Sequence, residues 1–193
     1  MTHALSRRSW CTALAVATLL LSGCGDDDTM IAGTHVARLG DTYLALVLDD
    51  PDGLAVAYAC DGREGAPSTV YAWFEGTLSG GAGELTGKWG SLTIDAAAGH
   101  ATGELRLTGA EPQAYAADPS AAAALVWGSS PPEEADLLGG WIFADDGTQR
   151  GAVLKRPTSD VAAFTLPSIS TASIVFEGTT LKLERMLSPE HVQ

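Results

Sequence analysis

The 193-residue chain contains no asparagine, few cysteines and few basic residues. The absence of asparagine removes every N-glycosylation sequon and leaves tight turns to Asp-Gly rather than Asn-Gly. Lys and Arg number 11 against 24 Asp and Glu, which gives a formal net charge of −13. Because such a field repels phosphate groups at long range, we expect no nucleic-acid partner. With 46% hydrophobic residues and 3 cysteines, the composition also excludes wholesale disorder and a disulfide-dense scaffold.

Motifs for catalysis and metal binding are missing as well. The chain has no Gly-x-Ser-x-Gly, no His-Glu-x-x-His and no phosphate-binding loop ending in Gly-Lys-Ser/Thr. His35, His100 and His191 are isolated residues without a patterned acid or base partner. Aspartates near glycines, as around Asp50 and Asp61, suit calcium, but turn chemistry explains them with fewer assumptions. The sequence therefore predicts no enzymatic activity, no cofactor and no metal site.

The N-terminus has the order of a secretory signal peptide, which we assign to residues 1–23. Arg7 and Arg8 precede an apolar run from Trp10 to Leu21. This run is shorter than the roughly 20 residues that a transmembrane helix needs, so cleavage is favoured over a retained membrane span.

The end of the apolar run, Leu21-Ser22-Gly23-Cys24, resembles the lipobox of bacterial lipoprotein precursors. The resemblance implies cleavage after Gly23 and a diacylglyceryl group on the Cys24 thiol. The chain would then be exported and anchored through this lipid, to the outer face of the plasma membrane or to an outer membrane if one is present. An unlipidated cysteine beside an ordinary cleavage site is the alternative.

The segment that follows, residues 24–32, is predicted to be a lipidated cysteine and a flexible acidic tether. Cleavage removes Arg7 and Arg8 but no acidic residue, so the net charge becomes −15. An anionic membrane would repel that charge, which leaves the lipid as the source of membrane affinity.

Cys60 is the one thiol that remains, because Cys11 leaves with the signal peptide and Cys24 carries the lipid. It ends an apolar stretch, which favours a buried core residue over a nucleophile or redox site.

Residues 33–185 are a succession of short β-runs separated by Gly, Asp and Pro, which predicts an all-β fold. We expect a single antiparallel β-barrel or barrel-like sandwich, with a C-terminal tail over residues 186–193. A short helix is an open alternative over Asp118–Leu125, where an N-cap, a first-turn proline and alanines follow one another. The predicted strands are 34–38, 42–48, 54–60, 69–77, 83–89, 91–95, 101–108, 113–117, 123–127, 140–144, 148–155, 162–166, 172–176 and 179–184.

Aromatic residues are the strongest candidates for a binding site. Aromatic walls often line barrel mouths that hold small apolar ligands, although filling of the core is the favoured interpretation of such side chains in a small β domain. From the set Tyr58, Tyr71, Trp73, Phe74, Trp89, Trp127, Trp141 and Phe143, we select Tyr58, Trp73, Trp89 and Trp141 as the candidate ligand-binding residues.

Three short patterns together resemble a group of uncharacterised exported, often lipid-anchored, bacterial β proteins. They are Tyr-x-Cys-Asp-Gly at 58–62, Ala-Trp-Phe-x-Gly at 72–76 and Gly-Trp-Ile at 140–142. The resemblance implies a single β domain and assigns no activity to it. We therefore expect a non-enzymatic binding or interaction module of the cell envelope, with an envelope protein as partner. The alternative is a carrier of a lipid or apolar small molecule in an aromatic-lined barrel pocket, and a thiol enzyme centred on Cys60 is a third hypothesis.

Overall fold

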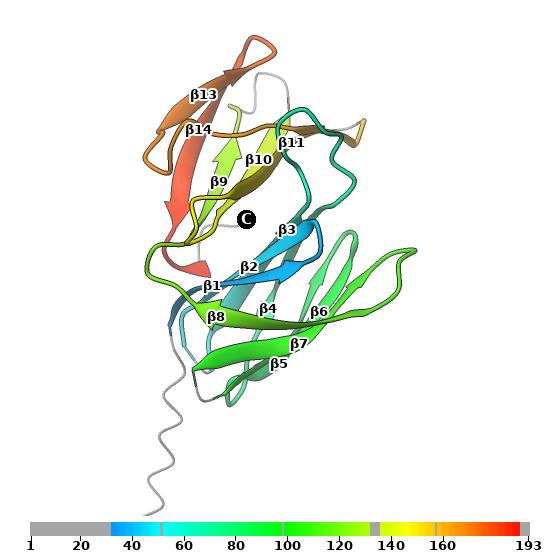
Figure 1. Cartoon of the computed structure of the whole chain (residues 1–193), viewed down its shortest axis with the longest axis vertical. Coiled ribbons are helices and arrows are strands. Elements are labelled where there is room, and N and C mark those ends of the chain that lie inside the picture. The colour runs from blue at the N-terminus through cyan, green and yellow to red at the C-terminus, as the bar shows by residue number, and fades with distance from the viewer. Residues whose placement is uncertain (1–31, 51, 98, 132–135, 157, 190–193) are drawn as a thin grey trace, which may run out of the picture.

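The computed structural model describes residues 32–50, 52–97, 99–131, 136–156 and 158–189. The predicted signal peptide, Cys24, most of the tether and the end of the tail lie outside these residues. The described residues form fourteen β-strands and no α-helix, arranged as a closed barrel beneath a curled sheet (Figure 1). The predicted all-β fold with an antiparallel barrel is confirmed.

The barrel is formed by the first eight strands, each paired antiparallel with its neighbours. It closes through a short seam between the first and last strands, in which His35 pairs with Pro119 and Val36 with Asp118. The strands are β1 (Gly33–Leu39), β2 (Thr42–Leu48), β3 (Leu54–Cys60), β4 (Tyr71–Thr77), β5 (Ala82–Gly87), β6 (Gly90–Ala97), β7 (His100–Leu107) and β8 (Gln113–Pro119).

The barrel interior is filled by side chains. Leu44, Leu46, Phe74, Leu85 and Leu92 are among its fully buried members, and alanines of β3 occupy the space between the larger residues. Alternation of large and small residues fills a small barrel in this way. On β7, Leu105 is buried inside while Arg106 is exposed outside, as the polar–apolar alternation predicts.

The second layer is a six-stranded sheet in the order β12-β11-β10-β9-β14-β13. It covers the outer face of β2 and β3, and the two layers share a core of buried residues from both (Figure 1). Its strands are β9 (Ala124–Ser129), β10 (Leu137–Phe143), β11 (Gln149–Lys155), β12 (Asp160–Ala163), β13 (Ser173–Phe176) and β14 (Thr179–Met186).

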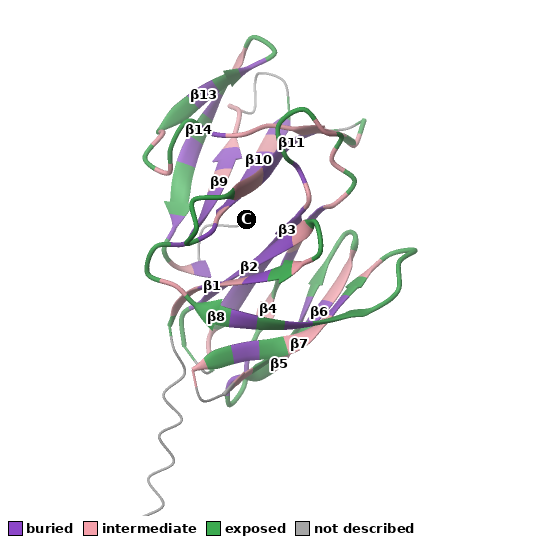
Figure 2. Ribbon diagram, in the orientation of Figure 1, coloured by how far each residue is buried: buried purple, intermediate pink, exposed green. Residues whose placement is uncertain are grey.

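Strands β2 and β3 are buried on both faces, as Figure 2 shows where the two layers meet. Leu44 and Leu46 point into the barrel, whereas Tyr43, Ala45 and Val47 pack between barrel and sheet. This placement explains the nearly continuous apolar sequence of β2, because a strand covered on both faces has no polar side.

The helix considered for Asp118–Leu125 does not form, and that alternative is wrong. β8 instead continues to Pro119 and pairs with β1, which closes the barrel. The hydroxyl of Ser120 then accepts a hydrogen bond from the backbone N–H of Ala123 at 2.8 Å, and β9 starts directly afterwards. Helix propensity over these residues is outweighed by the strand pairing that the barrel requires.

Candidate functional site

Three aromatic residues gather on the outer face of β3 and β4, toward the sheet. The rings of Tyr58 and Trp73 are stacked with centroids 4.4 Å apart, and Tyr71 meets Tyr58 edge-on at 5.4 Å. Tyr58 and Tyr71 are buried, and Trp73 is half-buried. Tyr58, Tyr71 and Trp73 are called the aromatic cluster below.

Glycine at position 140 brings the sheet against the aromatic cluster. A Cβ atom on Gly140 would lie 2.5 Å from Cζ of Tyr58 and 2.8 Å from Cζ2 of Trp73. A similar approach occurs at Gly62, whose carbonyl accepts a hydrogen bond from the N–H of Gly151 at 2.8 Å. The three short patterns that are distant in the sequence therefore meet at one interface between barrel and sheet.

The aromatic cluster contains buried polar atoms without hydrogen-bond partners. Within the described residues, these are the hydroxyls of Tyr58 and Tyr71 and the indole Nε1 of Trp73. Burial raises the pKa of Tyr71 well above its usual value, and the nearby Trp73 indole offsets part of that rise. The Tyr71 hydroxyl and the Trp73 indole N–H are not positioned to form a hydrogen bond with each other. A buried polar group without a partner costs about 1–3 kcal/mol, so each such atom requires an explanation.

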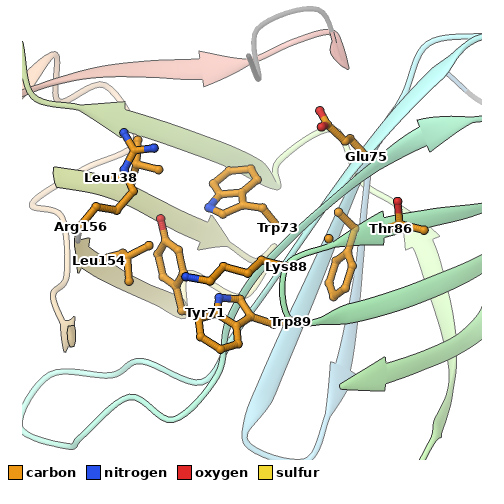
Figure 3. A pocket seen from close by; sticks show the side chains of 11 residues that line it. Tyr71, Trp73, Glu75, Thr86, Lys88, Trp89, Leu138, Leu154 and Arg156 are labelled. Carbon is orange, nitrogen blue, oxygen red and sulfur yellow. The ribbon is translucent and has the colours of Figure 1, made fainter. Parts of the chain in front are cut away.

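A pocket of about 270 Å³ opens beside these atoms, in the crevice between the barrel and the sheet. Figure 3 shows Tyr71, Trp73, Lys88 and Trp89 on the barrel side. Leu138 of β10, Leu154 of β11 and Arg156 line the sheet side (Figure 3). The hydroxyl of Tyr71 and the indole nitrogen of Trp73 face the same space between these walls (Figure 3). The pocket therefore combines apolar walls with a few polar groups, which is typical of small-molecule sites.

The cationic side chains of the lining, Lys88 and Arg156, lie at the Tyr71 end of this pocket (Figure 3). Arg156 is oriented by Asp136, whose carboxylate accepts hydrogen bonds from Nε at 2.9 Å and Nη2 at 2.5 Å. Lys88 Nζ lies 4.6 Å from the centroid of the Trp89 ring, and no carboxylate of the described residues pairs with it. The acidic residue of the lining, Glu75, lies toward the opposite end (Figure 3).

The β5–β6 turn separates this pocket from a second one of about 230 Å³. Lys88 and Trp89 form the tip of that turn, and Lys88 Nζ donates a hydrogen bond across to Ser159 Oγ at 3.2 Å. Tyr71 and Trp89 line both pockets. The turn therefore bridges the crevice from the barrel to the sheet.

The structure brings two of the four candidate ligand-binding residues to the pocket. Trp73 and Trp89 line it, and Tyr58 is stacked behind Trp73. Trp141 lies instead in the separate core of the curled sheet, where its indole N–H donates to the carbonyl of Phe164 at 2.8 Å. The pocket lies mainly between the barrel and the sheet, and Phe74 of the barrel core forms part of its lining.

Sequence reasoning missed the polar members of the site, Lys88 and Arg156, and gave Tyr71 no polar role. Lys88 and Trp89 stand between Gly87 and Gly90, a pattern that marks a hairpin tip and exposes both side chains. That signal was available for Lys88. No local signal indicates that Arg156 faces the barrel, because this contact depends on how the sheet packs.

The surroundings of Cys60 and Asp61 favour a structural role for both residues. Cys60 is fully buried, and burial raises the pKa of its thiol, which disfavours the reactive thiolate. Burial opposes the charge of Asp61, but hydrogen bonds from Thr69, Val70 and Ser68 outweigh it and hold its pKa below the usual value. Asp61 thereby fixes the loop between β3 and β4 directly before Tyr71, the first residue of β4 and a member of the aromatic cluster.

No group of three His, Cys, Asp or Glu side chains that could hold a metal is found among the described residues. The same residues contain no helix long and apolar enough to cross a membrane. No family model, curated protein or solved structure matches the chain.

Proposed function

We propose that the chain is an exported, lipid-anchored, non-enzymatic binding protein of the bacterial envelope, whose binding site is the crevice pocket. One observation carries the proposal of a binding site. The buried hydroxyl of Tyr71 and the indole N–H of Trp73 have no hydrogen-bond partner at the wall of an apolar pocket. A bound molecule that accepts these hydrogen bonds would remove the cost of burying them.

The fold supports a binding protein over a thiol enzyme or a protein-docking surface. The thiol of Cys60 is buried and its pKa is raised, so it is poorly suited to nucleophilic attack. Among the residues that the structure describes, the exposed large apolar ones belong to different elements and the C-terminal end: Leu54, Trp89, Val175 and Leu187. Scattered apolar residues of this kind are ordinary and do not indicate a protein interface.

The proposed anchor rests on the lipobox sequence Leu21-Ser22-Gly23-Cys24. Its test is metabolic labelling of the full chain with an alkyne-bearing fatty acid, followed by fractionation of membranes. We expect Cys24→Ser to lose the label and leave the membrane fraction. Cys11→Ser, which changes a cysteine inside the apolar run, is the matched control and should keep both. Equal labelling of the two variants would contradict lipidation at Cys24.

The proposed binding activity is tested by native mass spectrometry of the full chain, extracted in mild detergent from the membranes of its own host. We expect an additional mass that is released on denaturation. Trp89→Ala removes an exposed wall of the pocket and should reduce the occupied fraction. Leu54→Ala, at an exposed residue that does not line the pocket, should leave it unchanged. A bare mass in every preparation would contradict the proposal.

A further inference from the structure

The chemistry of the pocket indicates more than the presence of a ligand. Its unpartnered groups are an indole N–H, which only donates hydrogen bonds, and a phenolic hydroxyl. The raised pKa of Tyr71 keeps that hydroxyl protonated, and so able to donate, throughout the neutral range. A ligand group that satisfies both must therefore be a hydrogen-bond acceptor.

The charges beside these donors specify the acceptor further. Lys88 and Arg156 both line the pocket, whereas the single carboxylate of the lining, Glu75, lies toward the other end (Figure 3). The charge of Arg156 is balanced by its ion pair with Asp136, so Lys88 is the cation of the lining that a ligand can meet. Lys88 has no carboxylate partner among the described residues, so its charge is available to a bound anion.

The remaining walls and the volume limit the rest of the ligand. Trp73, Leu138 and Leu154 present apolar surface, which suits a hydrocarbon or aromatic body. The pocket volume of about 270 Å³ is close to the lower end of the range for small-molecule sites. This volume fits a small molecule and is too small for a folded partner.

We propose that the crevice pocket binds a small amphipathic carboxylate. Its carboxylate lies between Tyr71, Trp73 and Lys88, and its apolar body lies against Leu138 and Leu154. This inference rests on the proposed binding function and adds the chemical class of the ligand.

The test is calorimetric titration of the full chain with three probes that share one body and differ in the head group: phenylpropionate, phenylpropanol and phenylpropylamine. Hydrogen bonds to a charged acceptor contribute more than those to a neutral one, so we expect the carboxylate to bind about tenfold to a hundredfold more tightly than the alcohol. The amine should bind most weakly, because Lys88 repels it and an ammonium group cannot accept hydrogen bonds from Tyr71 and Trp73.

Variants separate binding from folding. Tyr71→Phe and Lys88→Met should each weaken phenylpropionate binding about tenfold, and Lys88→Met should leave phenylpropanol binding unchanged. The controls are Tyr115→Phe, which removes a hydroxyl inside the barrel, and Lys182→Met, which changes a lysine that lines neither pocket. Both controls should bind phenylpropionate as the unchanged chain does.

Alcohol or amine binding as tight as carboxylate binding would overturn the ligand class and leave the binding function standing. Absence of binding by all three probes up to about 10 mM would likewise overturn the ligand class. The native mass measurement then decides the binding function separately, since it depends on no chosen probe.

Discussion

Removal of the Tyr71 hydroxyl should not destabilise the protein, in contrast to removal of a hydroxyl that has a partner. Tyr71 is buried and its hydroxyl has no hydrogen-bond partner. An unpartnered hydroxyl in the protein interior costs about 1–3 kcal/mol, so Tyr71→Phe loses nothing and gains up to about 1 kcal/mol.

Tyr115 provides the matched comparison. It is also a buried tyrosine of the barrel, but its hydroxyl donates a hydrogen bond to the carbonyl of Thr93 at 2.9 Å. Tyr115→Phe leaves that carbonyl without this donor and should cost about 1 kcal/mol. The two variants remove the same atom, so their stabilities should differ by about 1–2 kcal/mol in favour of Tyr71→Phe.

The assay is urea unfolding of the full chain in mild detergent, with tryptophan fluorescence as the signal that reports unfolding. The midpoints should move in the predicted directions with an unchanged slope, because neither substitution alters the surface exposed on unfolding. A loss for Tyr71→Phe as large as that for Tyr115→Phe would refute the reasoning. It would show that the Tyr71 hydroxyl has a partner in the folded chain and is not available to a ligand.

Three further predictions concern the barrel seam, the interface and the thiol. Burial lowers the pKa of His35 below its usual 6.5, so as the pH falls through 6.5 the unfolded chain takes up a proton before the folded chain does, and the free energy of unfolding decreases. His35→Leu should flatten the dependence of the unfolding midpoint on pH below 6.5, and identical slopes for the two proteins would contradict this prediction. Gly140→Ala places a Cβ atom 2.5 Å from Tyr58 and should cost about 1–3 kcal/mol in urea unfolding; a loss below about 0.5 kcal/mol would mean that the layers are less closely packed. A thiol reagent should modify Cys60 in urea but not in the folded chain, and rapid modification of the folded chain would revive the thiol-enzyme hypothesis.

The positions of the strands along the chain could largely be predicted from the sequence, because the signals for strands and turns are local. The bounds predicted for β2 and β3 agree with the structure, since each is an apolar run between turn residues. Leu181 and Leu183 on β14 are buried between the exposed Lys182 and Glu184, as their alternation predicts.

The division into a barrel and a second sheet could not be predicted in this way. It depends on pairings between distant residues, such as Leu183 of β14 with Gly128 of β9. A run of short strands with turns is the same local signal for one barrel, a sandwich or a barrel with a covering sheet. The helix considered over Asp118–Leu125 failed for a related reason, because the barrel needs β8 as its closing strand.

The candidate site was predictable in its residue types and not in its place. Aromatic character singled out Trp73 and Trp89, which line the pocket, and also Trp141, which is in a different core. Which aromatic faces a pocket depends on which face of its strand is covered, and that follows from packing between the layers. The unpartnered state of the Tyr71 hydroxyl is likewise a property of the assembled interface.

The most direct test of the central claim, that the crevice pocket binds a small amphipathic carboxylate, is an NMR titration of the tryptophan indole N–H signals with phenylpropionate. The account predicts that the Trp73 signal moves downfield and saturates, because its unpartnered N–H gains an acceptor. The Trp141 signal should stay in place, because its N–H already donates to Phe164. A stationary Trp73 signal at saturating ligand, or equal movement of both signals, would contradict the account.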